Sequence, residues 1–418
     1  MPKRGAPRDG FTACFGGLKR RRAIRKSQTA HQFECHPLCA AYYCVLGLPK
    51  KQQPTSCCIT TTTSKGKHMH KSILGKRATT LIGLLMGVWL LNSQLLAQAP
   101  AAAAGTLETI KVTGVSLQGN LEGDSAERDV FVYLPPGYAS SPAKRYPVVY
   151  FLHGYGVGAA VYANNVLKLP GSADAAIAAG AQETIVVVPD AFTRYGGSMY
   201  SKSPTIGDWE MFIAHDLVDY IDANYRTLAK RESRGLSGHS MGGYGTMRVA
   251  MKHPEQFVAL YAMSACCLMN SAPEKAAVDA QNARVAAGIE VYKAGTFDNA
   301  LLAQAAAWAP NPQNGPLFFD FPYQNGEAQP VVQAKWAANS QLVLVDQYVP
   351  ELQQFKAIML DVGDKDGLVT TNTQLDAALT RLGVAHGWEV YDGDHGNRIG
   401  QRFIDKLLPY FSQHLKAE

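Results

Sequence analysis

A serine flanked by glycines is the residue of this 418-residue chain whose surroundings most clearly indicate chemistry. Ser240 stands at the centre of Gly238-His-Ser-Met-Gly242. Ser233–Ser237, before it, have the length of a buried strand, and Tyr244–Met251 follow with apolar residues at helical spacing. A serine on a sharp turn between a strand and a helix is exposed as a nucleophile, and flanking glycines avoid collisions with both elements. We therefore predict that Ser240 is a catalytic nucleophile.

Such a serine needs a general base, because its hydroxyl is a weak nucleophile near neutral pH, and the base needs an acid to orient it. When the serine sits on this kind of turn, the order along the chain is serine, acid, histidine. His395 lies in the polar loop Asp392–Asn397, just past the last predicted strand, and is the predicted base. The other histidines downstream occupy a helix end, a turn before a strand and the terminal helix: His253, His386 and His414.

The acid should follow the preceding strand, where Gly363-Asp-Lys-Asp-Gly367 offers two aspartates. We favour Asp366, because the residues before it let the chain turn back over the edge of the sheet. Asp364 remains an alternative. So does Asp394, although a residue adjacent to His395 in sequence rarely points at that ring.

Two backbone N–H groups must also stabilise the oxyanion that forms during acyl transfer. The residue after the nucleophile, Met241, supplies one. The second is expected from the loop Phe151–Gly156 after the first buried strand, where Gly154 allows a close turn and Tyr155 provides the N–H. We interpret His153 as a hydrogen-bonding support of this loop.

The elements that must position these residues alternate between strand and helix. Apolar runs rich in β-branched residues predict parallel strands buried on both faces. With the serine turn, this alternation predicts an α/β-hydrolase fold: a mostly parallel sheet with helices on both faces. The predicted strands are Thr109–Leu117, Arg128–Leu134, Pro147–Leu152, Thr184–Pro189, Phe257–Met263, Ala357–Val362 and Trp388–Tyr391, and the main helices are Ala173–Gly180, Trp209–Tyr225 and Ile399–Leu415.

A segment of about residues 270–350 interrupts this alternation. It is rich in proline and contains a cluster of aromatic residues: Trp308, Phe318, Phe319, Phe321 and Tyr323. It is either a cap that shapes the acyl pocket or an insertion whose aromatic residues only pack together. Asp208-Trp209-Glu210 is expected to cap and pack its helix, with a substrate contact from Trp209 as the second interpretation.

The front of the chain differs in composition from the rest. Residues 1–77 contain 16 Lys and Arg against two carboxylates, so of the chain's net charge of +6 they hold +14 and the remaining 341 residues hold −8. A basic stretch, Met69–Arg77, an apolar run, Ala78–Leu91, and a small-residue motif, Ala97-Gln-Ala99, follow in the order of a secretory signal peptide. We therefore expect residues 69–99 to be a signal peptide and translation to start at Met69, with residues 1–68 a non-native leader.

Other interpretations of the front of the chain stay open. In one of them the leader is genuine and binds either nucleic acid through Arg20–Arg22 or a metal. The candidate metal ligands are Cys35, Cys39, Cys44, His31 and His36. In another, residues 78–99 remain as a membrane anchor. The favoured hypothesis is a catalytic domain of residues 100–418, secreted or periplasmic. Its only cysteines, Cys266 and Cys267, are adjacent and too constrained for an ordinary bridge.

Four stretches resemble a known family of α/β-hydrolases: Arg128–Tyr138, Pro147–Gly154, Trp209–Ile221 and Gly235–Gly243. They are similar to the esterase family that includes esterase D (S-formylglutathione hydrolases), feruloyl esterases, enterochelin esterases and mycolyltransferases. The resemblance extends from Arg128 to the C-terminus. It implies a serine esterase whose acid is the aspartate of a Gly-x-x-Asp turn, here Gly363 and Asp366, and whose base is His395.

Together these features predict an exported serine hydrolase that cleaves carboxylic esters through an acyl-enzyme. Small-molecule or polysaccharide-linked esters are the expected substrates, with no metal or organic cofactor and no nucleic-acid partner; membrane contact is expected only during export. Two alternatives remain. One is an acyltransferase that passes the acyl group to a sugar or lipid hydroxyl, and the other is a catalytically silent surface-binding protein.

Overall fold

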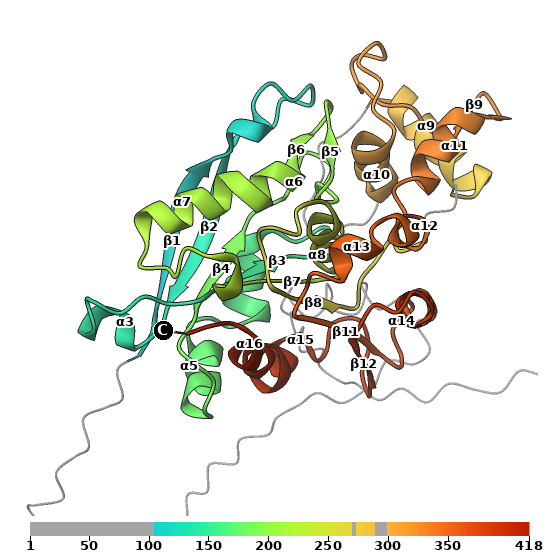
Figure 1. The fold of residues 1–418 in the computed structure, drawn as a ribbon. Helices are drawn as coiled ribbons and strands as arrows, with labels where there is room; N and C mark the ends of the chain where they lie inside the picture. The colour runs from blue at the N-terminus through green and yellow to red at the C-terminus, as the bar shows by residue number, and fades with distance from the viewer. Residues whose placement is uncertain (1–103, 270–272, 289–298, 418) are drawn as a thin grey trace, which may run out of the picture. The chain divides into compact units, whose positions relative to one another are not determined.

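An eight-stranded sheet organises the residues that the computed structural model describes, which are 104–269, 273–288 and 299–417 (Figure 1). The strand order is β1-β2-β4-β3-β7-β8-β11-β12. The pairs β1–β2 and β2–β4 are antiparallel, and every later pair is parallel. The strands span Thr106–Thr113 (β1), Glu127–Leu134 (β2), Val148–Leu152 (β3), Ile185–Pro189 (β4), Arg234–His239 (β7), Ala259–Met263 (β8), Ala357–Gly363 (β11) and Gly387–Tyr391 (β12).

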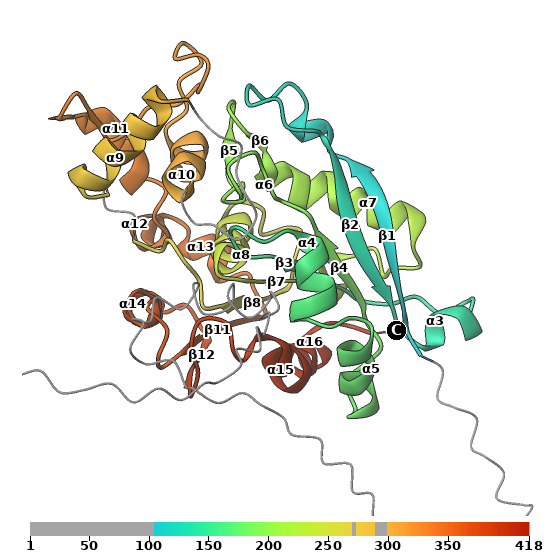
Figure 2. The same cartoon turned by 180° about the vertical axis from the view of Figure 1, so that it is seen from behind.

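Helices cover both faces of this sheet (Figures 1 and 2). On one face lie α6 (Trp209–Met211), α7 (Leu217–Asn224), α8 (Met241–Lys252) and α14 (Val369–Arg381), and on the other lie α4 (Ala159–Val161), α5 (Gly171–Ala178), α15 (Ile399–Arg402) and α16 (Leu408–His414). The strands β3, β4 and β8 are buried along their whole length, as parallel strands between two helical layers must be. The predicted α/β-hydrolase fold class is confirmed.

Several predicted boundaries were wrong. The first predicted strand ends at Thr113 and not at Leu117, because Gly114 leads into a 3-10 turn over Val115–Leu117 that turns Leu117 into the core. The predicted helix over residues 209–225 is interrupted by a π-type turn, Phe212–Asp216, and the terminal helix by another, Phe403–Leu407. Sequence periodicity does not show such turns, since they add one residue per turn without breaking the apolar face.

Short elements complete this part of the fold. A hairpin formed by β5 (Lys202–Ser203) and β6 (Gly207–Asp208) lies just before α6 and had no counterpart among the predicted elements. The remaining short segments are α3 (Gly137–Ser140), the π-type turn Tyr162–Val166 and the 3-10 turn Arg231–Ser233.

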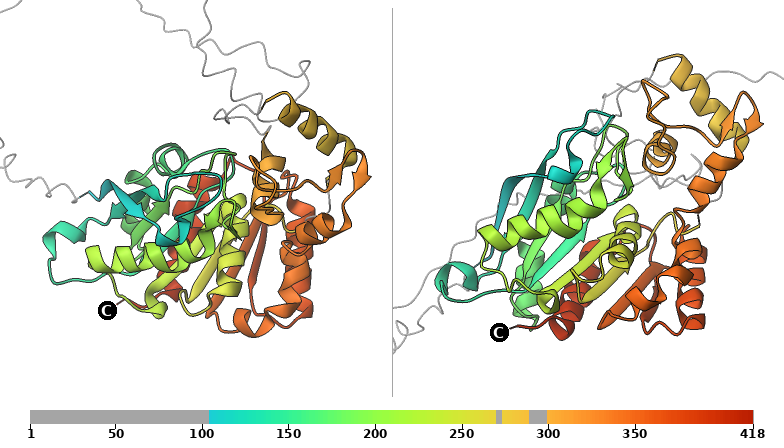
Figure 3. Two further views of the ribbon diagram at one scale, coloured as in Figure 1. Left: turned by 90° about the horizontal axis from the view of Figure 1, so that it is seen from above. Right: turned by 45° about the horizontal axis from the view of Figure 1, so that its top comes forward.

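The predicted insertion forms a group of short elements beside the β5–β6 hairpin (Figure 3). Within its described residues these are α9 (Lys275–Ala286), α10 (Ala300–Trp308), β9 (Tyr323–Gln324), β10 (Glu327–Ala328), α11 (Pro330–Ala337), α12 (Gln341–Leu344), a 3-10 turn (Val345–Gln347) and α13 (Val349–Leu352). Side chains of the hairpin region hold it: Ser203 Oγ donates to Ala306 O and Thr205 Oγ1 to Phe318 O, both at 2.6 Å.

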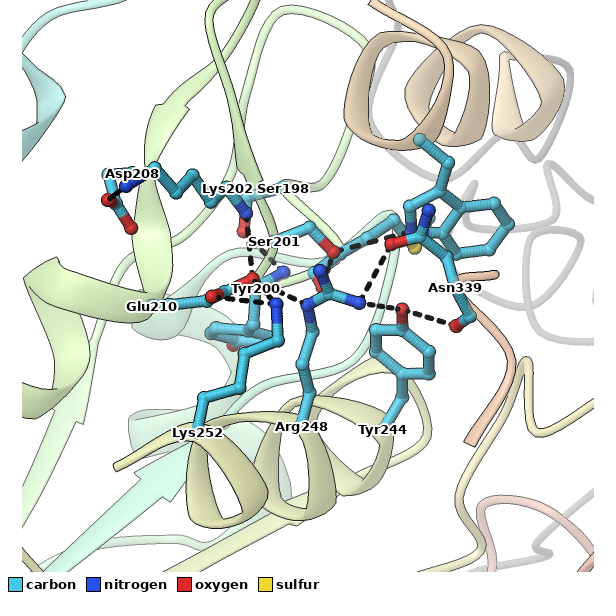
Figure 4. A network of polar contacts seen from close by, with 12 residues as sticks. Ser198, Tyr200, Ser201, Lys202, Asp208, Glu210, Tyr244, Arg248, Lys252 and Asn339 are labelled. Atoms are coloured by element: carbon cyan, nitrogen blue, oxygen red, sulfur yellow. Dashed lines mark hydrogen bonds and ion pairs between the residues drawn. The ribbon is translucent and has the colours of Figure 1, made fainter. Parts of the chain in front are cut away.

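Arg248, a buried cation on α8, joins this insertion to the main body (Figure 4). Arg248 Nε lies 2.7 Å from Glu210 Oε1, and Lys252 Nζ pairs with Glu210 Oε2 at 3.1 Å. Arg248 Nη1 donates to Tyr244 Oη at 3.0 Å and to Asn339 Oδ1, in the insertion, at 2.8 Å. Burial raises the pKa of Glu210, but its two cations outweigh burial and hold that pKa below its usual value. Removal of one partner would leave a buried charge unpaired, which destabilises the fold. The network therefore fixes α8 against α6, which carries Glu210, and against the insertion, which carries Asn339.

The proposed N-terminal segments, residues 1–68 and 69–99, lie outside the described residues. In the part that is described, none of the helices has both the length and the apolar character needed to span a membrane.

Two glycines allow close approaches at the turn between β7 and α8: Gly242 lets α8 approach β3, and Gly238 lets β7 approach α8. A Cβ at Gly242 would lie 2.0 Å from the carbonyl oxygen of Leu152 on β3, and a Cβ at Gly238 would lie 2.4 Å from the carbonyl oxygen of Gly242. Neither contact is relieved by rotating a side chain, since both oxygens belong to the backbone. The turn between β7 and α8 therefore requires glycine on both sides.

We expect Gly242→Ala to lower the free energy of unfolding by about 3 kcal/mol or more, because backbone atoms must move to admit the methyl group. Urea denaturation measures the change. Gly171→Ala, at the start of α5, is the matched control, because a Cβ there meets nothing within 4 Å, and it should stay within about 0.5 kcal/mol of the parent. Equal stability of the two variants would contradict the packing described here.

Candidate active site

Ser240 occupies the turn between β7 and α8 in a strained backbone conformation. Its φ of 58° and ψ of −113° lie in a region that residues with a side chain rarely adopt. The neighbouring strand holds it there: Ser240 N–H donates to Met263 O at 3.0 Å, and Ser240 O accepts from Cys266 N–H at 3.1 Å. Both groups lie at or just after the end of β8. The nucleophile predicted from sequence is thus presented at the carboxyl edge of the parallel strands.

His395 and Asp366 meet Ser240 at this edge. His395 Nε2 lies 3.0 Å from Ser240 Oγ, and His395 Nδ1 lies 2.8 Å from Asp366 Oδ2. The three residues follow β7, β11 and β12, and carboxyl ends of parallel strands lie along one edge. Residues separated by 155 positions in sequence therefore come within hydrogen-bond distance.

The surroundings of Asp366 favour its ionised form. Its side chain is only 2% exposed, and burial alone raises its pKa. The hydrogen bond from His395 lowers the pKa, as does the backbone N–H of Leu368, which donates to Asp366 Oδ1 at 2.9 Å. The balance holds the pKa of Asp366 below its usual value. A carboxylate beside an imidazole stabilises the protonated form of that ring.

The two alternative aspartates have other partners. Asp364 Oδ1 accepts the backbone N–H of Gly393 at 2.9 Å, which ties the end of β11 to the loop that carries His395. Asp394 Oδ1 accepts the N–H groups of Gly396 and Asn397 and so closes the turn around His395. Both residues shape the loop, and the structure brings Asp366 to the ring.

The loop after β3 lies against Ser240 and contains Tyr155, one of the two residues predicted for the oxyanion site. A Cβ built on Gly154 would lie 3.5 Å from Ser240 Cβ. Met241 is the first residue of α8, where backbone N–H groups have no partner within the helix. The side chains of Tyr155 and Met241 both reach Gly197, so the two residues lie on the same side of the turn.

His153 fixes the peptide group that carries the Tyr155 N–H. Its Nδ1 lies 2.8 Å from Gly154 O, and its Nε2 accepts the N–H of Ala191 at 2.8 Å, so the ring is a neutral tautomer that donates from Nδ1. Burial lowers the pKa of His153, which agrees with a neutral ring. Since the carbonyl and N–H of one peptide point in opposite directions, holding Gly154 O directs the Tyr155 N–H the other way. This contact fits the supporting role expected for His153.

A second buried histidine supports His395 and was not found from the sequence. His239 Nε2 donates to the backbone carbonyl of His395 at 2.7 Å, and His239 Nδ1 accepts from Tyr162 Oη at 2.8 Å. Burial is the largest cause that lowers the pKa of His239 to about 3, so the ring stays neutral. The signal that the sequence offered for His239 was its position directly before Ser240. Tyr162 gave none, because it lies in a π-type turn 77 residues earlier.

Trp209, the weaker substrate-contact candidate, lies in the core with 1% of its surface exposed. Its indole N–H donates to Ile206 O at 2.9 Å and its ring packs edge-on against Phe212. Asp208 Oδ1 accepts the N–H of Met211 and caps the helix. These contacts correspond to the capping and packing interpretation, and we do not assign Trp209 to the substrate.

The aromatic residues of the insertion mostly pack together. Phe319 and Phe321 line a cavity of about 460 Å³ that lies within the insertion and that Ser240, Asp366 and His395 do not line. Trp308 is buried against Tyr244 and Trp336. The insertion approaches the site through α10 instead, where Gln304 Nε2 lies 3.8 Å from Cys267 Sγ.

One group of side chains in the described residues has the geometry of metal ligands. One ligand atom each from His215, His253 and Glu255 lie within 4.8 Å of one another. His253 is at the opposite end of α8 from Ser240, and a 12-residue helix is about 18 Å long. An ion held there would not reach the reacting atoms at Ser240.

Comparison with known families decides where the chain belongs. The family model described as "Putative esterase" matches residues 125–410, which include Ser240, Asp366 and His395. The chain belongs to this esterase family. The family resemblance predicted from four short stretches of sequence is therefore confirmed.

Curated relatives agree with this esterase assignment. The chain is 34% identical over 136 residues to an esterase of Mycobacterium tuberculosis, which covers 31% of this chain and 27% of that protein. It is 32% identical over 138 residues to an endo-1,4-β-xylanase/feruloyl esterase of Xylanibacter ruminicola, covering 30% and 18% of the two chains. The chain thus spans less than a third of the length of these relatives.

A solved ferulic acid esterase shares the fold, with a TM-score of 0.52 at 22% identity over 75% of this chain and 99% of the other.

Replacing His239 should make the free energy of unfolding less dependent on pH. Between its ordinary pKa of 6.5 and about 3, the unfolded chain binds a proton at this ring and the folded chain does not, so the free energy of unfolding falls as pH falls, by about 1.4 kcal/mol per pH unit. His239→Gln keeps an amide donor and acceptor but does not titrate. Urea denaturation between about pH 4 and 7, the range in which the ring gains a proton in the unfolded chain only, should show a shallower slope for the variant. Identical slopes would show that His239 is not the buried neutral ring described.

Proposed function

We propose that this protein hydrolyses carboxylic esters through an acyl-enzyme formed on Ser240. The observation that carries the proposal is the hydrogen-bonded chain from Ser240 Oγ to His395 Nε2 and from His395 Nδ1 to Asp366 Oδ2, at 3.0 and 2.8 Å. A nucleophile, a base and an orienting carboxylate in this order perform acyl transfer on several unrelated folds. Membership of the esterase family supports the same chemistry.

In the proposed mechanism, Ser240 Oγ attacks the ester carbonyl while His395 Nε2 takes the hydroxyl proton. The carbonyl oxygen becomes an oxyanion, which the N–H groups of Tyr155 and Met241 stabilise. His395 then gives its proton to the leaving alcohol and the acyl-enzyme forms. Water, deprotonated by His395, repeats the attack and releases the acid. Asp366 remains a carboxylate throughout and pairs with the imidazolium.

The substrate is an ester whose acyl group fits beside the Gly154 loop, Cys266 and α10. The names of two similar proteins include feruloyl or ferulic acid esterase, so aryl esters belong in the test with alkyl ones. A panel of methyl ferulate and p-nitrophenyl esters of increasing chain length, compared by kcat/KM, ranks the acyl groups. Including a sugar acceptor and analysing products distinguishes hydrolysis from transfer to a hydroxyl.

Three substitutions test the roles proposed for the site. Ser240→Ala should reduce kcat for a p-nitrophenyl ester by at least about 10⁴-fold, because no acyl-enzyme can form. Asp366→Asn should reduce kcat by about 10⁴-fold with little change in KM, because an amide neither fixes the histidine tautomer nor pairs with imidazolium. Asp364→Asn is the matched control, since its amide oxygen still accepts the Gly393 N–H, and it should stay within a few-fold of the parent.

An active Ser240→Ala variant would contradict the acyl-enzyme. If Asp364→Asn were the more damaging aspartate variant, Asp366 would not be the orienting acid.

We also propose that the enzyme is exported, with residues 69–99 removed as a signal peptide. The support is the order of basic, apolar and small-residue segments in the sequence. Intact mass of the protein purified from its native host should correspond to a chain that begins near Pro100. A mass that includes residues 1–68 would contradict both the start at Met69 and the cleavage.

A further inference from the structure

Two adjacent cysteines lie next to the turn that carries Ser240. Cys266 and Cys267 follow β8, the strand beside β7 in the sheet, and are both free and partly exposed. Their Sγ atoms are 2.7 Å apart and face each other. They are the only cysteines among the described residues, and the proposed mechanism uses neither side chain.

The backbone of this pair is part of the support of Ser240. The N–H of Cys266 donates to the carbonyl of Ser240 at 3.1 Å. Cys267 has a φ of 58°, a left-handed conformation that is uncommon for a residue with a side chain. A change in the geometry of the two cysteines must therefore act on the hydrogen bond that holds the carbonyl of the nucleophile.

The side chains of the pair also border the site on two sides. Gln304 of α10 lies 3.8 Å from Cys267 Sγ. On the other side, Cys266 is within electrostatic reach of Tyr162, whose hydroxyl bonds to His239.

The two thiols differ in their readiness to react. The hydrogen bond between the two thiols, together with burial, holds the pKa of Cys266 well above its usual value. The thiolate is the form that attacks disulfides, so Cys266, which keeps its proton, is a poor attacking thiol. Cys267 is therefore the attacking thiol and Cys266 the resolving one.

A bond between adjacent cysteines differs from a structural disulfide. Ordinary disulfides join Cα atoms about 4.4–6.8 Å apart, whereas neighbouring residues across a trans peptide are about 3.8 Å apart. The short ring is strained, and strained disulfides are reduced easily and serve as labile or regulatory bonds. Such a pair suits reversible oxidation and not stabilisation of the fold.

We propose that Cys266 and Cys267 form a redox-sensitive modification site, at which a small-molecule disulfide oxidises the pair to a vicinal disulfide and lowers esterase activity. The effect on activity rests on the function proposed above; the modification itself does not. An extracytoplasmic location, as proposed above, is an environment in which such a bond persists.

The oxidation proceeds in two exchanges. The Cys267 thiolate attacks one sulfur of the disulfide, forms a mixed disulfide and releases one small thiolate. Cys266 then loses its proton, and its thiolate attacks Cys267 Sγ and releases the second small thiolate. Two protein thiols are oxidised, and one small disulfide is reduced to two thiols. Ring closure changes the backbone geometry of Cys266, whose N–H holds the Ser240 carbonyl.

The test uses the full chain, equilibrated in glutathione mixtures of increasing oxidised fraction, quenched with acid and alkylated with iodoacetamide. The tryptic peptide of residues 253–275 contains both cysteines. We expect it to lose both alkyl groups and to become lighter by two hydrogens as the mixture becomes oxidising. In parallel, kcat for a p-nitrophenyl ester should fall by about tenfold or more, since small displacements of a nucleophile have large effects on rate, and dithiothreitol should restore both readouts.

Cys267→Ser is the matched control, because it keeps the backbone and cannot form the bond. Its activity should not depend on the glutathione ratio. A parent peptide that keeps two alkyl groups in every mixture would overturn the modification site. A vicinal disulfide that forms without a change in kcat would overturn the regulatory role. If the parent hydrolyses no ester in any mixture, the proposed function fails, whereas the peptide mass still decides whether the thiol site exists.

Discussion

The strained turn at Ser240 is the constraint on which the rest of the site depends. A residue with a side chain does not hold a φ of 58° and a ψ of −113° unless its neighbours leave no alternative. Here the neighbours are backbone atoms of β3, of β8 and of the residues just after β8. Leu152 O would lie 2.0 Å from a Cβ at residue 242, and Met263 O and Cys266 N–H hold both polar groups of the serine. The nucleophile is therefore positioned by the sheet, and its hydroxyl needs no side-chain partner other than His395.

The base and the acid depend on a second close approach at the same edge. A Cβ at Gly363 would lie 2.2 Å from Gly393 O, so the loops after β11 and β12 touch through glycine. The carboxylate of Asp364 accepts a hydrogen bond across this contact, and the ring of His239 donates one to the carbonyl of His395. The imidazole is thus fixed through its backbone as well as through Asp366. Sites built on rigid strand ends in this way keep their geometry during catalysis.

Much of this arrangement could be predicted from the sequence, because the strongest signals are local. The glycines around Ser240 indicate a turn, and a polar loop after the last strand indicates His395. Asp366 was favoured over Asp364 by its position after the strand and by the Gly-x-x-Asp turn of the family resemblance, and the two aspartates have different partners in the structure. Alternation of strands and helices gave the fold class, since a buried parallel strand is apolar along its whole length.

What the sequence did not reveal depends on contacts between distant residues. His239 and Tyr162 are 77 residues apart, and no periodic pattern links them. The buried pairing of Glu210 with Arg248, which joins α6 to α8, gave no signal either, because charged residues on helices usually face solvent. The role of the insertion was ambiguous for the same reason: aromatic residues indicate burial, and only the fold shows that Gln304 of α10, rather than those aromatic residues, lies next to the cysteines behind Ser240.

The central claim is that one serine, activated by its surroundings, forms a covalent intermediate. The most direct measurement is peptide mapping of the native protein after treatment with a fluorophosphonate, which reacts only with activated serines, while residual ester hydrolysis is followed in the same sample. The account predicts one adduct, on Ser240 in the tryptic peptide Gly235–Arg248, and a loss of hydrolysis in proportion to it. An adduct on another serine, or hydrolysis that persists when Ser240 is fully modified, would contradict it.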